Sequence, residues 1–379
     1  MKIEHVFAIP LRIPAPGNES SLGKFDEYRY GLVVVLTDEG IAGFGEISTL
    51  WDGAGDVQCS FVRDYFAPRL IGRDPRQIEA CLYETRTLRE GAEPARAAVD
   101  MALFDLTGKA VKQPVYQLLG GRCRDSIPLS RSVMMGTPLE MARKAEEAVE
   151  DGYRCVKVKV GRGRDVDRAA VGSVRKAVGD IVLVRVDANM AWATPKEAIA
   201  NIRLLEGFDL HSVEQPMPRL GIRDWLLLRE AVAVPIMVDE SVWGPREAWT
   251  LLAAGAVDML NVYVAEAGGL LASRQIFEMG QLAGVPCVLG SMPELGIGTA
   301  AAIHLGISRP NLTDPCDAAG AAYQKVDVVT ERLEVREGTV TVGDAPGLGV
   351  EIDWDSVAQV ASDEGTRRVV SEVRTMIEV

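Results

Sequence analysis

Three apolar runs in the middle of the chain each end in an acidic side chain: IVLVRVDAN (181–189), LHSVEQP (210–216) and IMVDES (236–241). A helical stretch separates each run from the next. Short strands that alternate with helices predict a parallel sheet, whose strands all end at the same edge. We therefore expect Asp187, Glu214 and Asp239 to lie together at the carboxyl edge of that sheet.

The same alternation continues on both sides of these runs. Eight strands are expected, at residues 127–134, 155–160, 181–186, 210–213, 236–238, 259–264, 286–289 and, weakly, 312–315. Helices are expected between them, at residues 139–150, 165–178, 195–206, 223–231, 245–254 and 270–283. Eight strands with intervening helices favour a closed TIM-type barrel over an open doubly wound sheet, which would normally have fewer strands. No Gly-x-Gly-x-x-Gly or P-loop pattern suggests a nucleotide site.

The rest of the chain is predicted as mixed α and β. A hairpin is expected at residues 31–46, a helix at 95–112, and a final helix near 360–377. The segment after the barrel is too short to fold alone. We therefore divide the chain into an α+β capping domain, a barrel, and a C-terminal segment that packs back on the capping domain, with bounds 1–125, 126–320 and 321–379.

Composition limits the partners of this protein. Its 379 residues include 41 Lys plus Arg and 54 Asp plus Glu, a net charge of −13. Such an acidic surface repels phosphate backbones, so we expect no nucleic-acid partner. No apolar stretch approaches the ~20 residues of a membrane helix, and the first residues lack a signal-peptide pattern, so we expect a cytoplasmic protein with no membrane partner.

Three carboxylates at one edge of a sheet repel one another unless a cation lies between them. Histidine and cysteine do not cluster near these acids, which favours Mg²⁺ over Zn²⁺. The competing interpretation is that each acid only caps the following helix, where it interacts well with the helix dipole. Three such acids in successive repeats favour the metal site.

Two lysines in the second barrel strand, CVKVKV (155–160), carry the other part of the chemistry. Lys157 and Lys159 are two residues apart, so both point to one side of the strand, and the valines point to the other. In a barrel the lysines would face the interior. Their mutual repulsion is expected to lower the pKa of at least one of them and so produce a base. An edge strand with a solvated polar face is the competing interpretation.

Together, a metal site and a buried lysine indicate one kind of reaction. The base removes the proton α to a carboxylate, while the metal and the other lysine stabilise the enediolate.

The ordered set of motifs resembles the enolase superfamily, in its muconate lactonizing enzyme and mandelate racemase-like group. The resemblance covers essentially the whole chain and rests on these segments: Lys157-x-Lys159, Val186-Asp187-Ala188-Asn189, Val213-Glu214-Gln215-Pro216, Val238-Asp239-Glu240-Ser241, Asn261 to Gly269, and Glu294 to Ala301. Enolase-superfamily sites that use lysine bases with Mg²⁺ are known.

The resemblance implies a modified (β/α)₇β barrel under a capping domain completed by the C-terminal tail. It implies Mg²⁺ bound by Asp187, Glu214 and Asp239. It also implies that Lys159 is the α-proton base, that Lys157 is its partner, and that Glu294 contacts the substrate near its carboxylate. Cap loops would select the substrate, and they correspond here to residues 14–28 and 49–55, including Trp51. Relatives are often dimers or octamers, so a homo-oligomer is expected.

One position departs from the resemblance. Relatives of the lactonizing group usually have a second lysine two residues after the asparagine of strand six, and here that residue is Tyr263. A tyrosine with a reference pKa near 10 is a better acid than base. Tyr263 could act as the second acid, hydrogen-bond the substrate, or pack passively.

The leading hypothesis is a Mg²⁺-dependent isomerase, of the cycloisomerase or the racemase and epimerase type, acting on a small carboxylate or an amino-acid derivative. One alternative is a dehydratase of acid sugars or hydroxy acids, a lyase that uses Lys159 on one face only. Another is a non-catalytic descendant that keeps the metal site. A phosphate-binding barrel of another class would leave the row of carboxylates unexplained.

Overall fold

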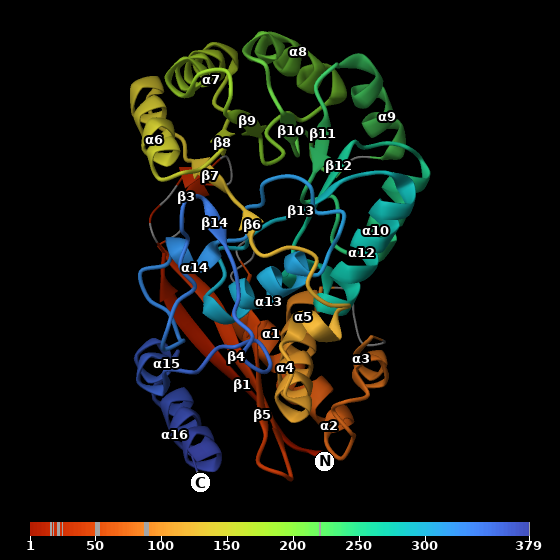
Figure 1. The fold of residues 1–379 in the computed structure, drawn as a ribbon, viewed down its shortest axis with the longest axis vertical. Helices are drawn as coiled ribbons and strands as arrows, with labels where there is room; N and C mark the ends of the chain where they lie inside the picture. The colour runs from red at the N-terminus through yellow and green to blue at the C-terminus, as the bar shows by residue number, and fades with distance from the viewer. Residues whose placement is uncertain are drawn as a thin grey trace.

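The computed structural model describes residues 1–378, apart from residues 16, 18, 21–22, 25, 50–53, 87–90 and 220. Figure 1 shows two regions: a ring of strands and helices, and below it an antiparallel sheet with its own helices. The predicted fold class, a parallel barrel with a separate α+β N-terminal region, is confirmed.

Seven parallel strands form the barrel sheet, in the spatial order β13-β12-β11-β10-β9-β8-β7. Their bounds are β7 (Ser130–Val133), β8 (Cys155–Lys159), β9 (Leu183–Asp187), β10 (Ser212–Glu214), β11 (Ile236–Val238), β12 (Met259–Val262) and β13 (Cys287–Leu289). The main helices between and after them are α6 (Pro138–Glu150), α7 (Arg164–Val178), α8 (Pro195–Leu205), α9 (Ile222–Ala231), α10 (Pro245–Ala253), α12 (Leu270–Ala283) and α13 (Gly296–Ile307). Each of the six helices predicted between the strands lies where the sequence placed it.

Among the described residues, no full strand occupies the eighth position of the barrel; a short segment with a single β-bridge lies there. The weak signal at residues 312–315 does not form a strand. Instead Cys316 makes a single parallel bridge to Leu129, and the backbone N–H of Asp317 donates to Leu289 O at 2.8 Å. This short segment therefore closes the barrel between β13 and β7.

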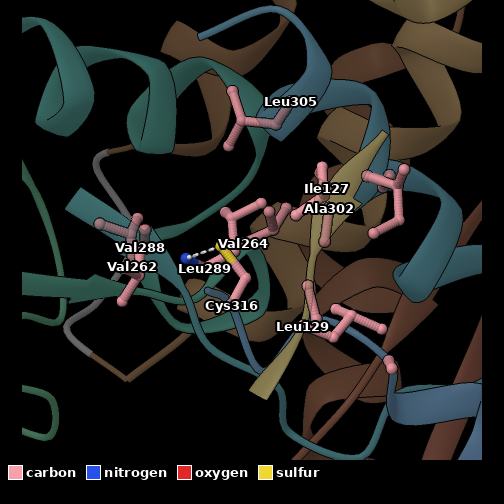
Figure 2. Close-up of a cluster of buried hydrophobic side chains, with 14 of the residues drawn as sticks. Ile127, Leu129, Val262, Val264, Val288, Leu289, Ala302, Leu305 and Cys316 are labelled. Carbon is pink, nitrogen blue, oxygen red and sulfur yellow. Dashed lines mark hydrogen bonds between the residues drawn. The ribbon is translucent and has the colours of Figure 1, made fainter. Parts of the chain in front are cut away.

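Buried apolar side chains pack around this closure. Figure 2 shows Cys316 beside Leu289 of β13, whose backbone N–H donates to Cys316 Sγ at 3.2 Å. Ile127 of β6 (Ile127–Pro128) and Leu305 of α13 lie in the same cluster. The closure is thus held by packing as well as by backbone hydrogen bonds.

Local sequence explains where the barrel helices begin. Thr137 caps α6: its hydroxyl accepts from the backbone N–H of Glu140, whose side chain accepts in return from the backbone N–H of Thr137. Proline follows the cap at the first position of the helix, where no backbone donor is needed. The same arrangement of threonine cap and proline begins α8.

The N-terminal region is an antiparallel sheet in the order β1-β4-β5, covered by a long helix. The strands are β1 (Ile3–Pro14), β4 (Glu27–Thr37) and β5 (Ala42–Ile47), and the long helix is α4 (Glu93–Val111). The smaller elements are β2 (Glu19–Ser20), β3 (Gly23–Lys24), α1 (Gly55–Phe61), the π-helix η1 (Val62–Phe66), α2 (Ala67–Leu70), α3 (Ile78–Thr85) and α5 (Val115–Leu118). The predicted hairpin is β4 and β5.

Strand β5 approaches α4 so closely that it needs glycine at the contact. A Cβ placed on Gly45 would lie 1.8 Å from the carbonyl oxygen of Ala98. We expect Gly45→Ala to lower the free energy of unfolding by about 1–3 kcal/mol, because backbone must move to admit the methyl group. Urea unfolding measures this change. Gly343→Ala is the matched control, since a Cβ there meets nothing within 4 Å, and an equal loss in both variants would contradict the packing argument.

The predicted final helix near residues 360–377 is α16 (Glu364–Glu378), which begins four residues later than expected. A separate short helix, α15 (Trp354–Val360), precedes it. The break arises because Ala361 pairs with Leu11 of β1 and the backbone N–H of Ser362 donates to Pro10 O. Asp363 then caps α16 through the backbone N–H of Thr366. Figure 1 shows both helices beside the N-terminal sheet.

Four further short elements complete the described fold: η2 (Glu206–Phe208) after α8, α11 (Val264–Ala267) after β12, α14 (Gly320–Tyr323), and β14 (Thr339–Val340), which pairs with β6. Within the described residues, no helix is both long and apolar enough to span a membrane. Trp51 and parts of both predicted cap loops, at 14–28 and 49–55, lie outside the described residues, so their role in substrate selection stays a prediction.

Candidate active site

Strand register places the predicted site residues in one row. Lys159 of β8 pairs with Asp187 of β9, and Asp187 pairs with Glu214 of β10. Asp239 directly follows β11, whose Met237 pairs with Glu214. All four side chains therefore leave neighbouring strands at the same end of the barrel, where barrel enzymes carry their active sites.

The three acids converge on a point that could hold a cation. One oxygen from each of Asp187, Glu214 and Asp239 can be chosen so that all three lie within 4.8 Å of one another, and all three residues are buried. Burial raises the pKa of Glu214 and that of Asp239, and neighbouring carboxylates raise both further. The acids thus repel one another as the sequence predicted.

The donor set fits a hard divalent cation. Glu214 Oε2 and Asp239 Oδ1 are fully buried and have no hydrogen-bond partner in the described part of the chain. Buried carboxylate oxygens of this kind are costly unless a cation or proton satisfies them. Since the three candidate ligands offer only oxygen, Mg²⁺ suits the site better than a metal that prefers nitrogen or sulfur.

Lys157 and Lys159 point into the barrel, as the alternation along β8 predicts. Val156 and Val158 pack in the hydrophobic core. Lys157 is buried among carboxylates, with its Nζ 3.0 Å from Glu214 Oε1 and 3.4 Å from Asp187 Oδ2. Its Nζ also donates to Asp317.

The charge around Lys157 reverses the pKa change expected from the lysine pair alone. Burial by itself would lower the pKa of Lys157, but the carboxylates of Asp317, Glu214 and Asp187 outweigh burial and raise it well above the usual value. Lys157 is therefore held as a cation. It is thus not the lysine whose pKa was expected to be lowered by repulsion within the Lys157–Lys159 pair.

Two residues of this network were missed from the sequence, Asp317 and Arg185. Asp317 accepts from Lys157 and from the hydroxyl of Ser130, and Arg185 Nη1 lies 3.7 Å from Glu214 Oε2 and 3.8 Å from Asp317 Oδ2. Both had a signal. Arg185 is two residues before Asp187 in one strand, so it shares the inner face. Asp317 follows the weak eighth strand signal as the other acids follow theirs.

Lys159 has a different environment from Lys157. Its Nζ donates to Asp187 Oδ2 at 2.5 Å and to Asn189 Oδ1 at 2.7 Å. Asn189 is itself oriented, because its Nδ2 donates to Glu240 Oε1 at 3.1 Å. Burial would raise the pKa of Asp187, but Lys159 and Lys157 outweigh it and hold that pKa at about 2.

Strand β12 brings two uncharged donors to the carboxylates. Asn261 Nδ2 donates to Glu214 Oε1 at 3.2 Å. Tyr263 follows the strand, is buried, and donates its hydroxyl to Asp239 Oδ2 at 2.8 Å. The predicted site residue Tyr263 therefore lies within the carboxylate cluster.

Glu294 lies after β13, and its hydrogen-bond partners lie outside the cluster of Asp187, Glu214 and Asp239. Its carboxylate accepts from the hydroxyl of Ser291 at 2.5 Å and from the backbone N–H of Met292 at 2.9 Å. It neighbours Glu46 of β5, which accepts from the backbone N–H groups of Leu295 and Gly298 at the start of α13. Glu294 thus lies where the N-terminal sheet meets the barrel.

Comparisons with known proteins agree with this arrangement. The family model for the mandelate racemase / muconate lactonizing enzyme N-terminal domain matches residues 5–120, and the enolase C-terminal domain-like model matches residues 140–356. The L-Ala-D/L-Glu epimerase of Bacillus subtilis is 34% identical over 84% of this chain and 88% of that protein.

Solved structures show the same fold. Muconate lactonizing enzyme from Pseudomonas fluorescens, in complex with muconolactone, aligns with a TM-score of 0.91 and 29% identity over 95% of this chain and 99% of that one. Dipeptide epimerase from Enterococcus faecalis, in complex with Mg and L-Leu-L-Tyr, aligns with a TM-score of 0.84 and 31% identity over 93% and 100%.

Proposed function

The chain belongs to the mandelate racemase and muconate lactonizing enzyme family of the enolase superfamily, and on this premise we propose that it is a Mg²⁺-dependent isomerase that removes the proton α to a carboxylate. Known relatives include epimerases, racemases and cycloisomerases, so the chain is an enzyme of the isomerase or lyase type. The proposed substrate is a small carboxylate or an amino-acid derivative such as a dipeptide.

The observation that carries this proposal is the pair of hydrogen bonds made by Lys159. Asp187 and Asn189 both accept from Lys159 Nζ, so two of its hydrogens are engaged and the remaining position on Nζ is directed away from these two residues. A lysine held in this way is oriented to exchange a proton in that direction.

Asp187, Glu214 and Asp239 would hold the Mg²⁺. The ion would supply positive charge to the substrate carboxylate as the α carbon loses its proton. Lys157, whose positive charge the surrounding acids favour, would place a second cation beside that carboxylate. Lys159 would then transfer the proton.

Deuterium exchange tests this function. The protein is incubated with Mg²⁺ in D₂O and a library of dipeptides, N-acyl amino acids, hydroxy acids and muconate-like acids. We expect deuterium at the carbon next to a carboxylate, or a rearranged product, for one class of compound, read by NMR and mass spectrometry. Binding of Mg²⁺ without exchange on any compound would instead support a non-catalytic descendant.

A one-face lyase, such as a dehydratase of acid sugars or hydroxy acids, is the second candidate. The observation that favours it is Tyr263, a phenol bonded to Asp239 at the position where relatives usually have a second lysine. Loss of water from a hydroxy acid in the same experiment would select the lyase over the isomerase.

A further inference from the structure

We propose that Tyr263 is a positioning residue: it holds Asp239 in place for the metal and does not transfer a proton to the substrate. The inference rests on the proposed function and deepens it, because it assigns exchange of the substrate proton to Lys159 and not to Tyr263.

The ring of Tyr263 is fixed by its neighbours. A Cβ placed on Gly290, just after β13, would lie 2.2 Å from Cε2 and 2.3 Å from Cζ of the ring. The ring therefore occupies the space that any other residue at position 290 would fill. Ala265 and Met292 pack against the same side chain. The ring therefore has no room to move toward β13 unless the backbone of Gly290 also moves.

The hydroxyl of Tyr263 is committed to one acceptor. A carboxylate only accepts hydrogen bonds, so the phenol proton lies on the 2.8 Å bond to Asp239 Oδ2. The other oxygen, Asp239 Oδ1, is buried and has no partner among the described residues. One oxygen of Asp239 is thus oriented by the phenol and the other is left for a cation.

Glu214 has the same arrangement. Its Oε1 accepts from Asn261 and Lys157, while Oε2 has no hydrogen bond in the described structure. Asn261 and Tyr263 are two residues apart, so β12 and the residue after it present two uncharged donors to two adjacent acids. An uncharged donor orients a carboxylate without neutralising it, which preserves its attraction for a divalent ion.

The consequence for the reaction is that, of the two side chains Lys159 and Tyr263, only Lys159 exchanges the proton. Racemisation and epimerisation by two opposed bases need a proton-transferring group on each face of the enediolate. With Tyr263 committed to Asp239, the product expected is one formed without inversion, as in a cycloisomerisation.

Magnesium titration of Tyr263→Phe tests the inference, because phenylalanine keeps the ring and removes the hydroxyl. We expect Mg²⁺ affinity, measured by calorimetry on the full chain without substrate, to fall by about 10–100-fold, the usual effect of losing a partner of a metal ligand. Saturating Mg²⁺ should then restore the exchange rate catalysed by Lys159. A second acid would behave differently: its loss would leave Mg²⁺ affinity unchanged and lower turnover at any Mg²⁺ concentration.

Tyr116→Phe is the matched control. The hydroxyl of Tyr116 also donates to a carboxylate, with 2.6 Å between Tyr116 Oη and Asp344 Oδ1. Because this pair lies outside the carboxylate cluster, its loss should leave Mg²⁺ affinity unchanged. Unchanged affinity in Tyr263→Phe, or an inverted product from the wild-type enzyme, would overturn the inference while leaving the proposed function standing. A wild-type chain that binds no Mg²⁺ would overturn the proposed function and the inference with it.

Discussion

Replacing Lys159 with alanine is expected to slow α-proton exchange by about 10³-fold or more, the contribution of a well-placed general base. The physical reason is that Lys159 is bonded to Asp187 and Asn189 at the carboxyl edge of the barrel, whereas Lys157 is held as a cation by its carboxylates and cannot replace it. The rate of deuterium incorporation at saturating Mg²⁺ is the measurement.

Two controls accompany this variant. Lys176→Ala removes an exposed lysine of α7 and should exchange at the wild-type rate. Because Lys159 also donates to Asp187, a candidate ligand, the Mg²⁺ affinity of Lys159→Ala is measured separately, and exchange is compared only at Mg²⁺ concentrations that saturate both proteins. Exchange at an undiminished rate in Lys159→Ala would assign the base to another side chain.

Replacing Asp239 with asparagine is expected to weaken Mg²⁺ binding by at least about 100-fold and to abolish turnover. Loss of a residue that only orients a metal ligand lowers metal affinity by up to about 100-fold, so loss of a charged ligand itself should lower it at least as much. The variant keeps the shape of the side chain and removes one of the three charges that converge within 4.8 Å. Calorimetric titration with Mg²⁺ measures the effect.

Asparagine at position 239 should also remove a source of repulsion. Glu214 and Glu240 are among the groups that raise the pKa of Asp239, so the neutral variant should fold at least as stably as wild type without metal. Asp180→Asn, on an exposed loop, controls for the loss of one negative charge. Equal Mg²⁺ affinity in wild type and Asp239→Asn would sink the assignment of the ligands.

Patterns within one or two repeats could be read directly from the sequence. The two-residue alternation of β8 predicted that Lys157 and Lys159 share the inner face, and the strand-end acids predicted the row at Asp187, Glu214 and Asp239. These inferences succeed because parallel strands in a barrel all end at one edge, so position along each strand determines position in space. The relation of each side chain to its own strand is local information.

Contacts between distant parts of the chain could not be read in this way. The closure of the barrel depends on Cys316 pairing with Leu129, and the break between α15 and α16 depends on Ala361 pairing with Leu11. Neither segment has a strong pattern of its own. Backbone groups there find partners that only the assembled fold supplies.

The barrel, the three candidate ligands and the inward lysines could be predicted from the amino-acid sequence alone, because periodicity and strand ends are properties of neighbouring residues. The folded chain was needed to find that Asp317 helps to keep Lys157 charged, and that Gly290 and Asp239 hold the phenol of Tyr263. The physical reason is that charge and packing act through space. The pKa of a lysine and the freedom of a ring depend on atoms that the chain brings close only when it is folded.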